Sequence, residues 1–155
     1  MRGPLPRFVM PALVIGALVI AACGGAAATD GGRRIDVQVK EFAFSQTAIT
    51  LTRGEKVTLA FTNAGTADHE FMAGRFGADN MGFAQDFFAG LKYQVAPPAS
   101  LHGKRHGTAQ GGVWMKPGET ASITFVVPDR AGTYEFGCFA TGHFAAGMKG
   151  SLTVE

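Results

Sequence analysis

Three side chains near the C-terminus have the chemistry to bind a soft metal ion. Cys138, His143 and Met148 follow one another at intervals of five residues. A thiolate, an imidazole and a thioether together suit copper, and two imidazoles with one thiolate and a weak axial thioether form a known copper arrangement. Only one histidine lies in this stretch, so a second must come from elsewhere, and His69 is the best candidate. These four residues predict one copper ion per chain, as Cu(I) or Cu(II).

Each of these residues also has an ordinary explanation when it is taken alone. A single cysteine can be a buried apolar residue or form an intermolecular disulfide, and a methionine near a chain end is usually part of the core. Cys138 has no disulfide partner within the domain, because the other cysteine, Cys23, precedes the domain and is expected to be lipidated. The order and spacing of the three side chains therefore favour a metal site.

The surrounding sequence predicts strands that would position these ligands. Apolar and polar residues alternate over 35–39, 57–61 and 121–127, and again on both sides of the ligand loop. A bend or bulge is expected at Glu41, where the first alternation breaks. Short strands separated by turns predict an all-β sandwich, and 13 phenylalanines with one tryptophan predict a core rich in phenylalanine.

The chain resembles the cupredoxins of the plastocyanin and azurin family over about 35–155. The resemblance rests on the Cys-x4-His-x4-Met spacing, on the ending Gly147-Met148-Lys149-Gly150 and on the turn that begins Met115-Lys116-Pro117-Gly118. It implies a Greek-key β-sandwich holding a type 1 blue copper site.

The same resemblance implies that His69, which follows an asparagine-containing turn, is the first copper ligand. It also implies that Asn63 and the residues beside His69 form hydrogen bonds around the thiolate, although Asn63 could instead form only an ordinary Asx turn. Asp68 and Glu70, on either side of His69, are expected to be solvated charges.

A long insertion, about 73–113, separates this chain from small plastocyanins. Phenylalanines and a leucine at three- and four-residue steps predict a short helix over 82–93. His102 and His106 then form either a solvated loop or an auxiliary copper or zinc site, with Met72, Met81 or Met115 as further ligands. Similar insertions, with a His-Glu-Phe-Met sequence like that of 69–72, occur in cupredoxins associated with copper tolerance.

The N-terminus is expected to direct the chain out of the cytoplasm. Residues 1–22 combine Arg2 and Arg7 with an apolar run, and the ending resembles a bacterial lipobox, which predicts cleavage before Cys23 and its lipidation. An uncleaved membrane anchor and a plain secretory signal are the alternatives. Residues 23–32 form a flexible linker, and 33–155 form the domain. The predicted location is the periplasm or the cell surface, on a lipid anchor.

Charge and composition exclude other function classes. Without Arg2 and Arg7 the chain has 12 basic and 12 acidic residues, which gives no basic surface for nucleic acid. Four histidines without a His-x-His motif do not suit a multicopper enzyme.

The predicted function is therefore one-electron transfer rather than catalysis, and copper tolerance, sequestration or delivery is the alternative. A redox partner is expected to dock beside His143 on an apolar face, unless Phe139 and Phe144 point inward. The sequence leaves the partner, the reduction potential and the oligomeric state open.

Overall fold

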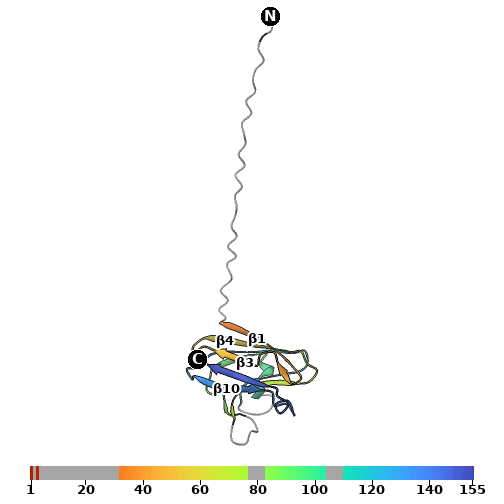
Figure 1. The fold of residues 1–155 in the computed structure, drawn as a ribbon, viewed down its shortest axis with the longest axis vertical. Coiled ribbons are helices and arrows are strands. Elements are labelled where there is room, and N and C mark those ends of the chain that lie inside the picture. Colours follow the sequence, from red (N-terminus) through yellow and green to blue (C-terminus); the bar gives the residue numbers. More distant parts are fainter. Residues whose placement is uncertain (2, 4–31, 77–82, 104–109) are drawn as a thin grey trace.

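The strands form two sheets that share one core. The computed structural model describes residues 1, 3, 32–76, 83–103 and 110–155 (Figure 1). One sheet has the order β2-β1-β4-β9-β7, and the other has the order β3-β11-β10-β5-β6 with β8 also paired to β5. The predicted all-β, Greek-key sandwich is confirmed.

The first sheet consists of β1 (Arg33–Lys40), β2 (Ala43–Phe44), β4 (Lys56–Asn63), β7 (Tyr93–Ala96) and β9 (Thr120–Val126). The second consists of β3 (Ala48–Leu51), β5 (His69–Phe76), β6 (Phe83–Asp86), β8 (Val113–Met115), β10 (Gly132–Gly137) and β11 (Lys149–Val154).

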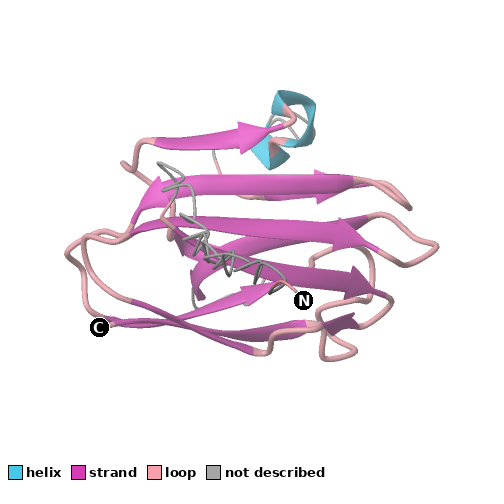
Figure 2. Ribbon diagram, turned by 90° about the horizontal axis from the view of Figure 1, so that it is seen from above, coloured by secondary structure: helices cyan, strands magenta, loops and turns pink. Residues whose placement is uncertain are grey.

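Alternating burial explains why these segments are strands. In β4, Val57, Leu59 and Phe61 are buried, and β4 pairs with β1 on one side and β9 on the other. Because successive side chains of a strand point to opposite faces, this alternation places one face of the sheet against the core. The strands run side by side along the molecule, as Figure 2 shows.

The core is rich in phenylalanine, as the composition predicted. Phe71 and Phe136 lie on neighbouring strands with ring centroids 5.1 Å apart, and Phe44 packs edge-on against both. Phe61 contacts Phe71 from the opposite sheet at 4.6 Å. These rings therefore join the two sheets directly beneath the strands that carry the predicted ligands.

The helix predicted over 82–93 is wrong. Phe83 begins β6 and pairs with Phe76, and the four residues after β6 form a turn before β7. The carboxylate of Asp86 accepts the Phe88 N–H at 2.9 Å, an Asx-type bond that competes with helix formation. A strand and then a turn direct the side chains of Phe83, Phe87 and Phe88 into the core. Their spacing therefore resembles a helical period although these residues form no helix.

Short helical turns occur elsewhere in the insertion. The 3-10 helix η1 (Pro98–Ser100) follows β7, and the helical segment lies at one edge of the fold in Figure 2. Among the residues that the structure describes, no helix is both long and apolar enough to cross a bilayer. The predicted leader apart from residues 1 and 3, the lipidation site Cys23 and the linker up to residue 31 lie outside those residues.

The bend expected at Glu41 is a tight turn between two paired strands. Lys40 pairs with Ala43, so Glu41 and Phe42 alone reverse the chain between β1 and β2. Phe42 has a positive φ of 62°, which is uncommon for a residue with a side chain. The turn places Glu41 and Phe42 beside the predicted metal ligands.

Candidate metal centre

Two neighbouring strands bring the predicted ligands together. His69 is the first residue of β5, Cys138 directly follows β10, and β5 and β10 are paired. The exposed fractions of Cys138 and His69 are both 0%, and that of His143 is 9%. The sandwich therefore holds the thiol and one imidazole in its interior and leaves the edge of the other imidazole at the surface.

The donor atoms are close enough to share one ion. The Sγ of Cys138 lies 3.3 Å from the Nδ1 of His143 and 3.9 Å from the Nδ1 of His69. Bonds of about 2.0–2.3 Å to nitrogen and sulfur would place such donors about 3.5–3.8 Å apart. Within the described ranges, these three residues form the single group of three or more His, Cys, Asp or Glu side chains that could hold a metal.

Hydrogen bonds within the ligand loop fix its closed shape. The N–H of Cys138 donates to the carbonyl of Met148 at 3.1 Å, and the N–H of Met148 donates to the carbonyl of His143 at 3.0 Å. Gly142 and Gly147 have φ values of 82° and 96°, which glycine adopts without a steric penalty. Met148 is fully buried, and these bonds join it to Cys138 and His143, so the four predicted ligands cluster as a candidate copper site.

The surroundings of the site keep the Cys138 thiol and the His69 imidazole uncharged before metal binding. Burial raises the pKa of the Cys138 thiol, and the N–H groups of Glu70 and Ala140 oppose that shift. Burial also lowers the pKa of His69, and the neighbouring His143 lowers it further. The unmetallated site therefore holds a neutral thiol and a neutral His69 imidazole at pH 7.

Metal binding is expected to release the thiol proton. Zinc(II) is the test ion here, because it has no redox chemistry. The pKa of Cys138 is raised and a thiolate is the ligand, so each zinc(II) ion that binds should displace about one proton from Cys138 at pH 7. The apparent affinity should then fall about tenfold for each pH unit below the thiol pKa. Calorimetry in buffers with different ionisation enthalpies counts the protons that are released on metal binding. The Cys138→Ser variant should release about one proton fewer. Equal proton release by both proteins would contradict the prediction.

Asn63 ties the ligand strand to its neighbours. Its Nδ2 donates to the carbonyls of Ala67 at 2.9 Å and Met115 at 3.2 Å, and its Oδ1 accepts the Gly65 N–H. The Asx turn is therefore present, together with two further bonds that brace the loop before His69. The hydrogen bond to the Cys138 sulfur comes instead from the Glu70 N–H, at 3.3 Å.

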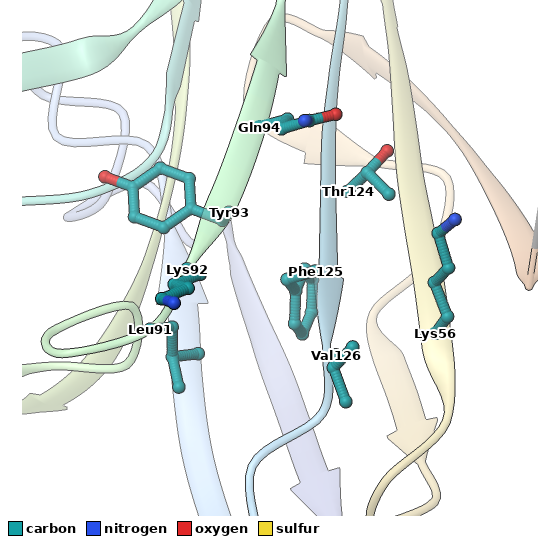
Figure 3. Close-up of a pocket in the computed structure, with 8 residues that line it drawn as sticks. All are labelled: Lys56, Leu91, Lys92, Tyr93, Gln94, Thr124, Phe125 and Val126. Carbon is teal, nitrogen blue, oxygen red and sulfur yellow. The ribbon is translucent and has the colours of Figure 1, made fainter.

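A surface groove lies away from this site. Figure 3 shows it between β4, β9 and β7, where Lys56 begins β4 and Val126 ends β9. The metal ligands lie near the other end of these strands, because Asn63 ends β4. This groove is therefore separate from the buried donor set of the metal centre.

Comparisons with known proteins agree with this geometry. The model of the copper binding proteins of the plastocyanin/azurin family matches residues 33–155. The chain belongs to this family. The cupredoxin is 30% identical to auracyanin-A of Chloroflexus aurantiacus over the full length of both chains. It is also 33% identical to the copper-resistant cuproprotein CopI of Rubrivivax gelatinosus, over 72% of this chain and 59% of that protein.

Solved structures support the same fold. Auracyanin B has a TM-score of 0.53 and 25% identity, over 79% of this cupredoxin and 88% of that chain. Dithionite-reduced auracyanin from Roseiflexus castenholzii has a TM-score of 0.54 and 24% identity, over 81% and 98%. Family, fold and donor set together make His69, Cys138, His143 and Met148 a candidate single copper site.

Two residues beside this site differ from their predicted environment. Glu70 and His102 were each considered as solvated groups, but both are buried, with His102 Nε2 3.4 Å from Glu70 Oε2. The His102 N–H also donates to the Gly112 carbonyl at 3.1 Å. His106 and Met81 lie outside the described residues, so the auxiliary metal site stays a prediction. His102 itself joins the insertion to the strand that carries His69.

Replacing His102 is expected to weaken the fold without removing copper. His102→Ala strips the buried Glu70 carboxylate of this contact, which should lower the free energy of unfolding by about 1–3 kcal/mol. Urea unfolding and metal analysis measure the two effects, with Lys92→Ala as the exposed control from the same insertion. Loss of a second bound metal ion in His102→Ala would instead establish the auxiliary site.

Proposed function

We propose that this cupredoxin transfers single electrons through a mononuclear copper site outside the cytoplasm. The observation that carries the proposal is a buried set of one thiol and two imidazoles that reaches the surface at the edge of His143. His69, Cys138, His143 and Met148 would hold the ion through one thiolate, two imidazoles and one thioether. Bound copper supplies a one-electron Cu(I)/Cu(II) couple. The core beneath the site fixes the donors, and their burial excludes water.

An apolar surface around His143 supports docking of a redox partner there. Phe42 is 53% exposed, and its ring meets the His143 ring edge-on with centroids 5.3 Å apart. Ala145 and Ala146 are exposed in the ligand loop. Weak apolar contact of this kind favours quick release of a partner. Phe42 was not predicted, because a strained turn rather than the ligand loop presents it.

The two loop phenylalanines contribute less to that surface. Phe139 and Phe144 are half-buried and stack on each other, with centroids 4.7 Å apart and planes inclined by 5°. Phe76 packs edge-on against both rings. These contacts support a role for Phe139 and Phe144 in stiffening the ligand loop, and they leave Phe42 as the foremost aromatic side chain for docking.

Voltammetry and partner kinetics test electron transfer. The copper-loaded full-length chain should show a reversible one-electron wave, and Phe42→Ala should slow electron exchange with a partner while leaving the potential near the wild-type value. Val126→Ala serves as the control, because Val126 is exposed on another part of the surface, whereas a phenylalanine such as Phe44 is buried. An irreversible wave, or a Phe42→Ala rate equal to that of the wild type, would count against the proposal.

Copper tolerance is the second candidate, favoured by the 33% identity to a protein named copper-resistant. It predicts copper-induced expression and a copper-sensitive strain after deletion of the gene. Electron transfer predicts instead a respiratory or photosynthetic defect at ordinary copper levels. The deletion strain, grown with and without added copper, separates the two functions.

A lipid anchor on Cys23 completes the proposed location. Cys23→Ser should move the protein from the membrane fraction to the soluble fraction. Mass spectrometry of the wild-type N-terminus should show a diacylglyceryl group on Cys23. An unmodified N-terminus in the soluble fraction would favour a plain secretory signal.

A further inference from the structure

Glu41 reaches across from the turn between β1 and β2 to the loop that precedes His69. Its Oε1 accepts the N–H groups of Thr66 and Ala67, the latter at 3.0 Å, and the Thr66 hydroxyl at 3.0 Å. A Cβ at Gly65 would lie 2.6 Å from the same oxygen, so the glycine leaves room for the carboxylate. One carboxylate thus holds the loop that leads into the first predicted ligand.

The same carboxylate oxygen faces the second nitrogen of His69. Glu41 Oε1 lies 3.9 Å from His69 Nε2, whereas His69 Nδ1 faces the Cys138 sulfur. The His69 side chain is fully buried, and its Nε2 has no hydrogen-bond partner among the described residues. The Glu41 carboxylate is therefore a charged group beside this buried nitrogen.

The protonation of a metal-bound imidazole gives this contact a chemical meaning. A neutral imidazole that binds a metal through Nδ1 carries its proton on Nε2. A carboxylate beside that N–H fixes the tautomer and the ring orientation and makes the ligand more basic. We propose that Glu41 is a positioning residue that holds His69 in its Nε2–H tautomer and, through its negative charge, favours Cu(II) over Cu(I). This inference rests on the proposed copper site.

The local charges agree with this role. Hydrogen bonds from its own N–H and from those of Thr66 and Ala67 lower the pKa of Glu41 to about 2, so the carboxylate is ionised across the neutral range. The other acidic side chains nearby belong to Asp68, which is exposed, and Glu70, which contacts His102. Glu41 is thus a permanent negative charge on the far side of the His69 ring from the metal.

Glu41→Gln separates the charge from the loop contacts. Glutamine keeps an oxygen that can accept the Thr66 and Ala67 N–H groups, but it removes the negative charge. The full-length chain should lose about tenfold in its Cu(II) affinity relative to its Cu(I) affinity. For a one-electron couple, that change raises the reduction potential by about 59 mV. Competition titrations with each copper ion and voltammetry measure the two quantities.

Two further variants make the test specific. Glu55→Gln is the matched control, because the Glu55 carboxylate also accepts a turn N–H, from Thr52 at 2.7 Å, but in another turn. It should leave the affinity ratio unchanged. Glu41→Asp keeps the charge on a shorter side chain and should stay within about threefold of the wild-type ratio. Equal shifts in Glu41→Asp and Glu41→Gln would show a loop effect alone and overturn the charge role.

The outcome also distinguishes this inference from the proposed function. If the wild-type chain forms an intense thiolate-to-copper absorption and Glu41→Gln keeps the wild-type potential, the role of Glu41 is wrong and the copper site stands. If the wild-type chain forms no such absorption, the copper site itself fails. A raised potential in Glu41→Gln, with Glu55→Gln unchanged, supports both.

Discussion

Cys138→Ser is expected to abolish the intense thiolate-to-copper absorption of the copper-loaded cupredoxin. The sulfur of Cys138 lies 3.3 Å from the Nδ1 of His143 and 3.9 Å from the Nδ1 of His69. Cys138 is also the only cysteine among the described residues, so no other described side chain can supply a thiolate. A serine hydroxyl is a poor ligand for Cu(I), because that ion selects soft sulfur donors. The Cu(I) affinity should therefore fall by at least about 100-fold. Visible and EPR spectra, with copper counted per chain, measure both losses.

Lys149→Ala provides the matched control for this experiment. Lys149 is exposed and follows Met148 directly, so its replacement perturbs the end of the ligand loop without removing a donor. It should keep the absorption and one copper ion per chain. If Cys138→Ser kept the band, the thiolate would have to come from Cys23, and the site described here would be wrong.

The donor set could be predicted from sequence because few residue types do this chemistry. Cys138, His143 and Met148 lie within one loop, and only three other histidines compete for the remaining position. Apolar alternation gave the strands on either side, since one face of each strand is buried. Short-range patterns were therefore sufficient to predict the sandwich and the three candidate ligands of the loop, whereas His69 lies far away in the sequence and was supported by the family resemblance.

The environment of the donors required long-range information. Glu41 is 28 positions before His69, and the two meet because β1 and β2 reverse at a two-residue turn. Glu70 and His102 are charged or polar in sequence, yet their mutual contact allows both to be buried. Local sequence periodicity does not predict such contacts, because each depends on how the fold places distant segments of the chain beside one another.

Phe136→Ala is expected to produce the largest loss of stability. Phe136 is fully buried on β10, two residues before Cys138, and its ring contacts those of Phe44 and Phe71. Removing a buried aromatic side chain leaves a cavity and costs about 3–5 kcal/mol. A domain of this size is stable by only about 5–15 kcal/mol, so the metal-free variant should be close to unfolding. Urea unfolding of the metal-free chain measures the change.

The response of Phe136→Ala to copper then tests whether the core and the site act together. A ligand that binds only the folded state stabilises it by RT ln(1 + [L]/Kd), so copper at about 1,000 times its Kd should restore about 4 kcal/mol. Phe139→Ala is the control, because Phe139 is half-buried in the ligand loop and should cost less. Full stabilisation of Phe136→Ala by copper would mean that the ligand geometry survives the cavity. A variant that folds but gains nothing from copper would mean that this aromatic core sets the positions of the donors, since Cys138 continues the strand that Phe136 anchors.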